Sequence, residues 1–164
     1  MIARRVGLLL TIGALLVAGC GSSSKSGSST STTDATTAGI PEVVVTATEY
    51  SFKFPQPTLP SGLVKITLKN EGTAPEGHQM NLIKMGSLTL NQIKARVAKT
   101  DLKGLPDDVK FVGGPNGVDP GKSASAVVDL EPGDYAAVCF IPDAKDGKPH
   151  SAHGMTETVT VAAR

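Results

Sequence analysis

The chain has 164 residues, with 16 Lys and Arg against 15 Asp and Glu and a formal net charge of +1 at pH 7. It carries no basic stripe interleaved with aromatic residues, so its composition gives no indication of a nucleic-acid-binding protein. Residues 40–164 are enough for one domain with its own hydrophobic core, and no internal repeat divides them.

The N-terminus has the three-part pattern of an export signal. Arg4 and Arg5 supply positive charge, and residues 7–19 are all apolar or small. This apolar run fits a signal peptide, which needs roughly 7–15 residues, better than a spanning helix, which needs ~20. Residues 17–20 (VAGC) resemble the lipobox of bacterial lipoproteins, in which small residues precede a cysteine that receives the lipid. An ordinary signal sequence with an incidental cysteine is the alternative.

We therefore predict a signal peptide over 1–19 and lipidation of Cys20, which would hold the exported chain at a membrane of the cell envelope, outside the cytoplasm. The next residues are almost wholly Ser, Thr and Gly. Such a segment cannot bury enough apolar surface to offset the entropy lost on ordering. Residues 20–39 are predicted to be a flexible linker, and the folded domain then spans 40–164.

Runs of β-branched and alternating residues predict an all-β domain. Residues 63–68 alternate apolar and polar side chains, as in a strand with one buried face. Gly/Pro turns separate several such runs, which is typical of a Greek-key β-sandwich or barrel. The predicted strands cover residues 42–47, 63–68, 79–83, 124–130, 135–140 and 156–161.

One helical insertion is predicted at 89–99. Thr89 and Gln92 have the spacing of a capping box at its start. The following residues, 100–122, are rich in Gly, Pro and Asp, and we predict a long surface excursion there. The helix would bury one apolar face, made of Leu90, Ile93 and Val97.

Cysteine usage indicates a bound group. If Cys20 carries lipid, Cys139 is the one thiol left in the chain. Unpaired thiols tend to oxidise outside the cytoplasm, and no second cysteine is left for an internal disulfide. Cys139 must therefore be buried and inert, or be occupied by a ligand.

Four side chains suited to one metal ion follow one another along the domain. His78 follows a loop, Cys139 ends a predicted strand, and His150 and Met155 come after the next loop. Two imidazoles, a thiolate and a distant thioether are the ligand set of a blue-copper site. Zinc is a poorer match, because methionine is poorly suited to its fourth position. Taken singly, each of these residue types is more often structural than functional.

These residues make the domain similar to the cupredoxin family, which includes plastocyanin, azurin and auracyanin. The resemblance covers the first strands, the Asn-Glu-Gly turn at 70–72, the G-x-Y-x-x-x-C pattern at 133–139, and a final His-x4-Met before a Thr-Val strand. It implies a cupredoxin-like Greek-key fold and one type 1 copper ion. It also places Tyr135 at the tyrosine-corner position of such domains.

By position, the resemblance implies that His78, Cys139 and His150 are the strong copper ligands and that Met155 is the weak axial ligand. His153 is an alternative to His150. We prefer His150 because it alone keeps the His-x4-Met spacing.

The resemblance further implies a single-copper electron-transfer protein. We do not expect an enzyme, because no nucleophile–base motif is present and three histidines are too few for a multicopper site. We predict a monomer with a redox protein as its partner. His150 would reach the surface through an apolar patch as the electron port, and the polar residues 143–148 would bulge outward. A Cu(I)-handling chaperone or scavenger is the second hypothesis, because His-x-Met pairs occur at 78–80 and 153–155. A copper-free recognition module, with Cys139 merely buried, is the third.

Overall fold

The computed structural model describes residues 39–73 and 75–163. The predicted signal peptide (1–19), the predicted lipidation site Cys20 and nearly all of the predicted linker (20–39) lie outside the described residues. No helix within the described ranges has the length and apolar character needed to cross a membrane.

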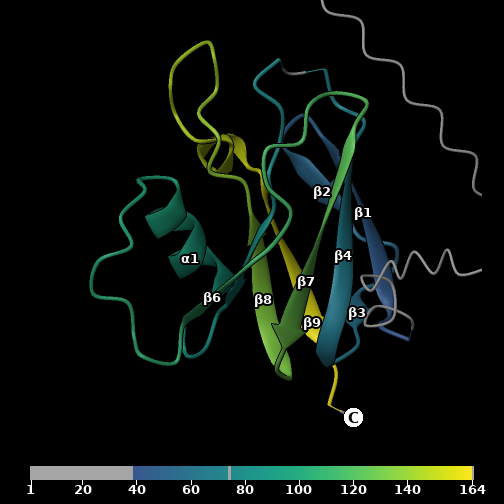
Figure 1. Cartoon of the computed structure of the whole chain (residues 1–164). Coiled ribbons are helices and arrows are strands. Elements are labelled where there is room, and N and C mark those ends of the chain that lie inside the picture. Colours follow the sequence, from purple (N-terminus) through teal and green to yellow (C-terminus); the bar gives the residue numbers. More distant parts are fainter. Residues whose placement is uncertain (1–38, 74, 164) are drawn as a thin grey trace, which may run out of the picture. The chain divides into compact units, whose positions relative to one another are not determined.

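Two β-sheets enclose the main hydrophobic cluster of the domain (Figure 1). The first sheet has the strand order β2-β1-β4-β7, and the second has the order β3-β9-β8-β5-β6. β1 runs parallel to β4, whereas β7 is antiparallel to β4 and both neighbours of β8 are antiparallel to it. The predicted all-β sandwich with one α-helix is confirmed. In chain order the elements are β1 (Glu42–Thr48), β2 (Ser51–Lys53), β3 (Thr58–Leu59), β4 (Gly62–Asn70), β5 (Asn81–Lys84), α1 (Leu90–Val97), β6 (Lys110–Gly113), β7 (Ser123–Leu130), β8 (Gly133–Val138), the 3-10 helix η1 (His150–His153) and β9 (Thr156–Val161).

Alternation of apolar and polar side chains orients the first sheet. In β4, Val64, Ile66 and Leu68 are buried and the residues between them are more exposed. They share one cluster with residues of the second sheet such as Leu82 and Val159. Burying an aliphatic side chain of this size is worth about 1.5–3 kcal/mol. A slip of one residue would expose this whole face, so the burial pattern sets the register of β4.

β8 is buried on both faces, and this determines where its last side chains point. Tyr135 and Ala137 join the cluster between the sheets, as does Cys139 just beyond the strand, while the side chains between them belong to a second cluster. Because successive side chains of a strand point to opposite faces, Cys139 is carried into the interior. The Tyr135 hydroxyl donates to the carbonyl oxygen of Glu131 at 2.8 Å, as expected for a tyrosine corner.

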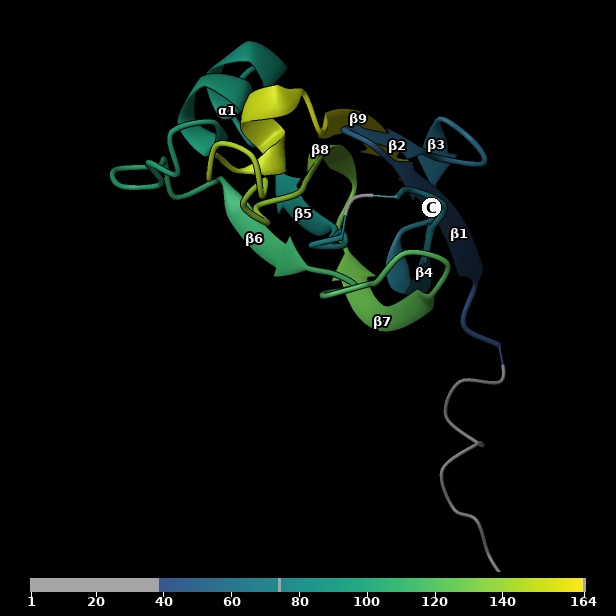
Figure 2. The same ribbon diagram turned by 90° about the horizontal axis from the view of Figure 1, so that it is seen from above.

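α1 covers the outer face of the second sheet, on the side away from β1 and β4 (Figures 1 and 2). The Thr89 hydroxyl accepts from the backbone N–H of Gln92 at 3.3 Å, and the Gln92 side chain accepts from the backbone N–H of Thr89 at 2.8 Å. The predicted capping box is confirmed. Ile93 and Val97 pack in the second cluster with residues of β5 and β8, so the helix buries the predicted apolar stripe.

Several boundaries differ from the prediction. The sequence does not predict β2, β3 or β6, because each has four residues or fewer and lies at a sheet edge, where the periodic signal is weak. β6 lies within 100–122, so this segment is not only a surface excursion. β5 begins at Asn81 rather than at residue 79, and β8 ends at Val138 rather than at residue 140. Cys139 and Phe140 continue the apolar run after the chain has left the sheet, and this hides the end of the strand.

Candidate metal centre

Backbone pairing with Val118 positions His78. The His78 N–H donates to the Val118 carbonyl at 3.0 Å, and the His78 carbonyl accepts from the Val118 N–H at 2.8 Å. Gly77 precedes it with a φ of +73°, and a Cβ there would lie 2.7 Å from the Val118 carbonyl oxygen. A glycine is therefore needed for this approach. The His78 imidazole is fully buried.

Cys139 is tied by its backbone to both ends of the segment that carries the later candidate ligands. Its N–H donates to the Met155 carbonyl at 3.2 Å, and its carbonyl accepts from the Ser151 N–H at 2.9 Å. The Met155 N–H donates in turn to the His150 carbonyl at 3.0 Å. Met155 is fully buried in the same cluster as Cys139.

The loop from Cys139 to His150 folds as a hairpin. The His150 N–H donates to the Ile141 carbonyl at 2.9 Å, and Pro142 forms an antiparallel bridge with Pro149. The hairpin returns the chain to the point where it left β8. His150 therefore lies beside Cys139, and its side chain has no exposed surface.

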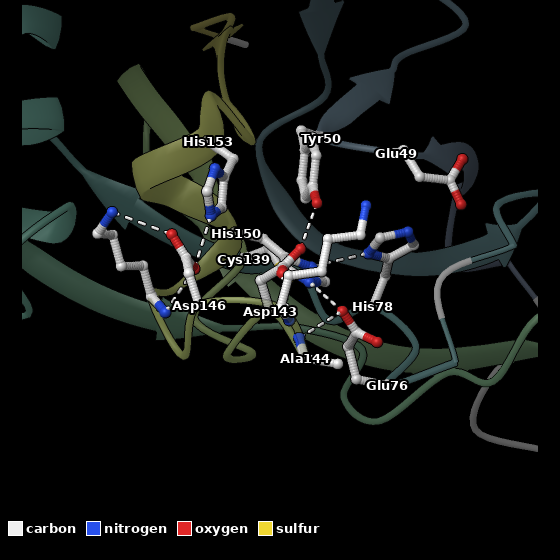
Figure 3. A network of polar contacts seen from close by, with 12 residues as sticks. Glu49, Tyr50, Glu76, His78, Cys139, Asp143, Ala144, Asp146, His150 and His153 are labelled. Carbon is white, nitrogen blue, oxygen red and sulfur yellow. Dashed lines mark hydrogen bonds and ion pairs between the residues drawn. The ribbon is translucent and has the colours of Figure 1, made fainter.

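The ligand atoms of three side chains converge at this point (Figure 3). The Nδ1 atoms of His78 and His150 are 3.2 Å apart, and the Cys139 Sγ lies 3.5 Å from the Nδ1 of His150. All three ligand atoms lie within 4.8 Å of one another. With bonds of ~2.0 Å to nitrogen and ~2.3 Å to sulfur, two ligands at a tetrahedral angle lie about 3.3–3.6 Å apart. The donor set and its spacing therefore fit one metal ion.

The surroundings of these groups penalise charge when no metal is bound. Burial raises the pKa of the Cys139 thiol, against backbone hydrogen bonds from Gln79 and Ile141 that favour the thiolate. Desolvation, and then the neighbouring His150, lower the pKa of His78. The Nε2 atom of His78 is buried and has no hydrogen-bond partner among the described residues. A cation among these groups would favour the thiolate and the neutral imidazoles, which are the forms that bind metals.

His153, the alternative to His150, lies outside this cluster. Its Nε2 lies 3.1 Å from Oδ1 of Asp146, and its side chain is 29 % exposed. The structure thus brings His150, and not His153, together with His78 and Cys139. The ligand roles of His78, Cys139, His150 and Met155 remain a prediction.

Known proteins share the fold but little sequence with this chain. No protein-family model and no curated protein matches it. Among solved structures, auracyanin B is 21% identical, with a TM-score of 0.51 over 75% of this chain and 89% of auracyanin B. The chain has the cupredoxin fold. An auracyanin of Roseiflexus castenholzii is 24% identical (TM-score 0.49, 74% and 97% covered). Auracyanin A of Chloroflexus aurantiacus, described as a blue copper protein, is 19% identical (TM-score 0.46, 74% and 99% covered).

In this cupredoxin fold, His150 does not reach the surface through an apolar patch, and that expectation is wrong. Polar groups cover its imidazole. The Tyr50 ring packs edge-on against it, with ring centroids 5.3 Å apart, and the Glu76 Oε1 lies 3.2 Å from its Nε2. The exposed large hydrophobic side chains of the described residues lie elsewhere, on β1, β4, β6 and β7.

The expectation that residues 143–148 bulge outward is also wrong in part. Asp143 folds back and is only 4% exposed, and its carboxylate accepts a hydrogen bond from the Tyr50 hydroxyl (Figure 3). This contact raises the pKa of Tyr50 to about 12 and lowers the pKa of Asp143. Asp146 is more exposed and binds His153 and Lys148. The hairpin therefore closes over the candidate centre.

The sequence does not predict the three residues that pack over His150, which are Tyr50, Glu76 and Asp143. Glu76 lies two positions before His78. A carboxylate so close to a candidate ligand is the one sequence feature that could indicate a role at the centre. Nothing in the sequence distinguishes Asp143 from Asp146, which belongs to the same polar run. Tyr50 lies in the β1–β2 turn, and its contact with the hairpin depends on how the loops pack.

Proposed function

We propose that this chain binds one type 1 copper ion and carries electrons outside the cytoplasm from a membrane-tethered position. The observation that carries this proposal is the convergence of the His78 Nδ1, the His150 Nδ1 and the Cys139 Sγ in the buried interior. Met155 would supply the weak axial thioether. Copper, when bound, would supply a one-electron redox couple.

The protein's own contribution would be a rigid and dry ligand cage. His78 is paired with Val118, and the segment that carries His150 is tied to Cys139 by backbone hydrogen bonds. Ligands held in this way move little when the charge of the ion changes, so little reorganisation opposes electron transfer. Burial of both imidazoles keeps water from the ion, which favours a carrier over a catalyst that needs an open coordination position.

Electrons would leave through the residues that pack over His150, because the imidazole itself has no exposed edge. Tyr50 is half-buried, and its ring contacts both His150 and the partly exposed His153, whose ring centroid is 5.0 Å from its own. A redox partner would therefore approach the face formed by Tyr50 and His153. No catalytic step on a substrate is part of this proposal.

The proposed tether is the lipid on Cys20 together with the linker of residues 20–39. A random coil of this length spans on the order of 25 Å root-mean-square, taking ~5–6 Å per square root of residue number. The carrier would thus stay close to redox proteins of the same membrane while its domain remains free to turn.

The second hypothesis, a Cu(I)-handling protein, receives less support. Met80 and Met155, the methionines of the two His-x-Met pairs, are both fully buried in the main cluster. A protein that passes Cu(I) to a partner needs sulfur ligands that the partner can reach. The two pairs do not form such an exposed site.

A visible absorption spectrum of the full chain tests the proposal, recorded after addition of Cu(II) and removal of excess metal. An intense thiolate-to-copper band, bleached by ascorbate and restored by ferricyanide, is expected. Cys139→Ser and His150→Ala should abolish it, whereas the matched control His153→Ala should retain it. A colourless protein that retains Cu(I) would instead indicate copper handling, and one that retains no copper would leave a recognition module.

A further inference from the structure

The two ring nitrogens of His150 have different neighbours. Nδ1 faces the Cys139 Sγ at 3.5 Å and the Nδ1 of His78 at 3.2 Å, whereas Nε2 lies 3.2 Å from the Glu76 Oε1. A carboxylate only accepts hydrogen bonds. The proton of a neutral His150 is therefore favoured on Nε2, and this leaves the Nδ1 lone pair directed at the candidate metal position.

The Glu76 carboxylate is itself held in place. Its Oε1 also accepts from the backbone N–H of Ala144, at 3.2 Å, so Glu76 ties the loop before His78 to the hairpin that ends at His150. A hydrogen bond from its own backbone amide is the main cause that lowers the pKa of Glu76. Within the part of the chain that the structure describes, His150 is its ion-pair partner, and the second oxygen, Oε2, is buried without a hydrogen bond.

We propose that Glu76 is a positioning residue of the metal centre, which selects the tautomer of His150 that binds metal through Nδ1 and lowers the reduction potential of the bound copper. A carboxylate bonded to the outer nitrogen of a ligand histidine raises the basicity of that ligand. Its negative charge, one imidazole away from the ion, favours the more positively charged Cu(II) state, and burial weakens screening by water. The redox half of this inference rests on the proposed function, whereas the tautomer half does not.

A second histidine–carboxylate pair provides a matched control. The Nε2 of His153 lies 3.1 Å from the Asp146 Oδ1, and the Nε2 of His150 lies 3.2 Å from the Glu76 Oε1. Both His153 and Asp146 are partly exposed, and neither belongs to the cluster of His78, Cys139 and His150. Removing the charge of Asp146 therefore changes the same kind of histidine–carboxylate pair at a site outside the cluster of His78, Cys139 and His150.

The first experiment uses the metal-free full chain with 15N-labelled histidine. NMR should show the Nε2–H tautomer of His150 in the wild type and in Glu76→Gln, since the amide oxygen still accepts a hydrogen bond. Glu76→Ala should lose this preference, and Asp146→Asn should keep it. A wild-type His150 protonated on Nδ1, or an unchanged tautomer in Glu76→Ala, would overturn the tautomer half.

The second experiment measures the reduction potential of the copper-loaded full chain. Glu76→Gln and Glu76→Ala should both have a higher potential than the wild type, and Asp146→Asn should match the wild type. Because Glu76→Gln keeps the hydrogen bond, a rise in that variant isolates the effect of charge. No rise in Glu76→Gln, or an equal rise in Asp146→Asn, would overturn the redox half. If the wild type forms no coloured copper complex, the proposed function fails, yet the metal-free NMR still decides the role of Glu76 toward His150.

Discussion

The Nδ1 atoms of His78 and His150 lie 3.2 Å apart in the interior of the domain, although 72 positions separate the two residues in the chain. At most one proton fits between these two nitrogens, and a charge on the His78 ring would be buried away from water. Within residues 39–73 and 75–163, the Nε2 of His78 has no hydrogen-bond partner that would compensate this charge. A cation that accepts both Nδ1 lone pairs would remove this conflict, so the arrangement favours metal binding.

Copper should therefore stabilise the folded chain. A ligand that binds only the folded state adds about 2.7 kcal/mol when its free concentration is 100 times its Kd. Thermal unfolding of the full chain should show a higher Tm with copper, and a chelator should reverse the shift. Cys139→Ser should lose most of this gain. An equal gain in Cys139→Ser would mean that copper binds away from the proposed centre.

Met155→Leu should retain copper and raise its reduction potential. Leucine keeps the volume of the side chain but removes the thioether that tunes the potential of such sites. The swap should cost less than about 1.5 kcal/mol of stability, because it nearly conserves volume. Met80→Leu is the matched control, since Met80 is equally buried in the same cluster and is not an assigned ligand. An unchanged potential in Met155→Leu, or the same shift in Met80→Leu, would contradict the axial role.

Tyr50 should titrate at a pH well above that of an ordinary tyrosine. Its hydroxyl donates to the Asp143 carboxylate, and this raises the pKa of Tyr50 to about 12. Because the folded-state pKa is raised, the stabilisation linked to it is fully present below about pH 10, the pKa of an unperturbed tyrosine, and is lost as the pH rises through 12.

Tyrosinate absorbance measured against pH tests this. Asp143→Asn should lower the pKa of Tyr50 toward about 10, because the amide carries no charge to oppose ionisation. Tyr50→Phe identifies which transition belongs to Tyr50, since Tyr135 is the other tyrosine of the chain. A Tyr50 transition unmoved by Asp143→Asn would show that the carboxylate does not hold the phenol.

Two glycines of one loop should respond differently to replacement by alanine. A Cβ at Gly114 would fall on the carbonyl oxygen of Met80, where the loop packs against the chain entering β5. Gly117 has a φ of +62° but open space around it, so Gly117→Ala should cost only about 1–2 kcal/mol for the left-handed backbone. Gly114→Ala should lower the free energy of unfolding by clearly more, measured by urea denaturation. Equal costs would mean that the loop does not pack this closely.

Much of the fold could be predicted from local patterns. β4 and β9 are predictable from the alternation of apolar and polar residues and from their β-branched residues. α1 is predictable because Thr89 and Gln92 form its cap. The short edge strands are not predictable, because two to four residues are too few to show a periodic hydrophobic pattern. The end of β8 was misplaced because both faces of the strand are covered, so Cys139 continues an apolar run that no longer belongs to the sheet.

The sequence by itself determined which side chains are suited to a metal ion, since thiol, imidazole and thioether chemistry belongs to the residue type and the order of the four residues is visible in the chain. Only the tertiary structure decided between His150 and His153, and only it placed Glu76, Tyr50 and Asp143 over His150. Backbone pairs return the hairpin that ends at His150 to Cys139. The His150 side chain is therefore buried beside Cys139, whereas the His153 side chain is partly exposed. The contacts of Tyr50 and Glu76 with this hairpin join loops that are far apart in the sequence. They follow from the packing of the two sheets and not from any local pattern.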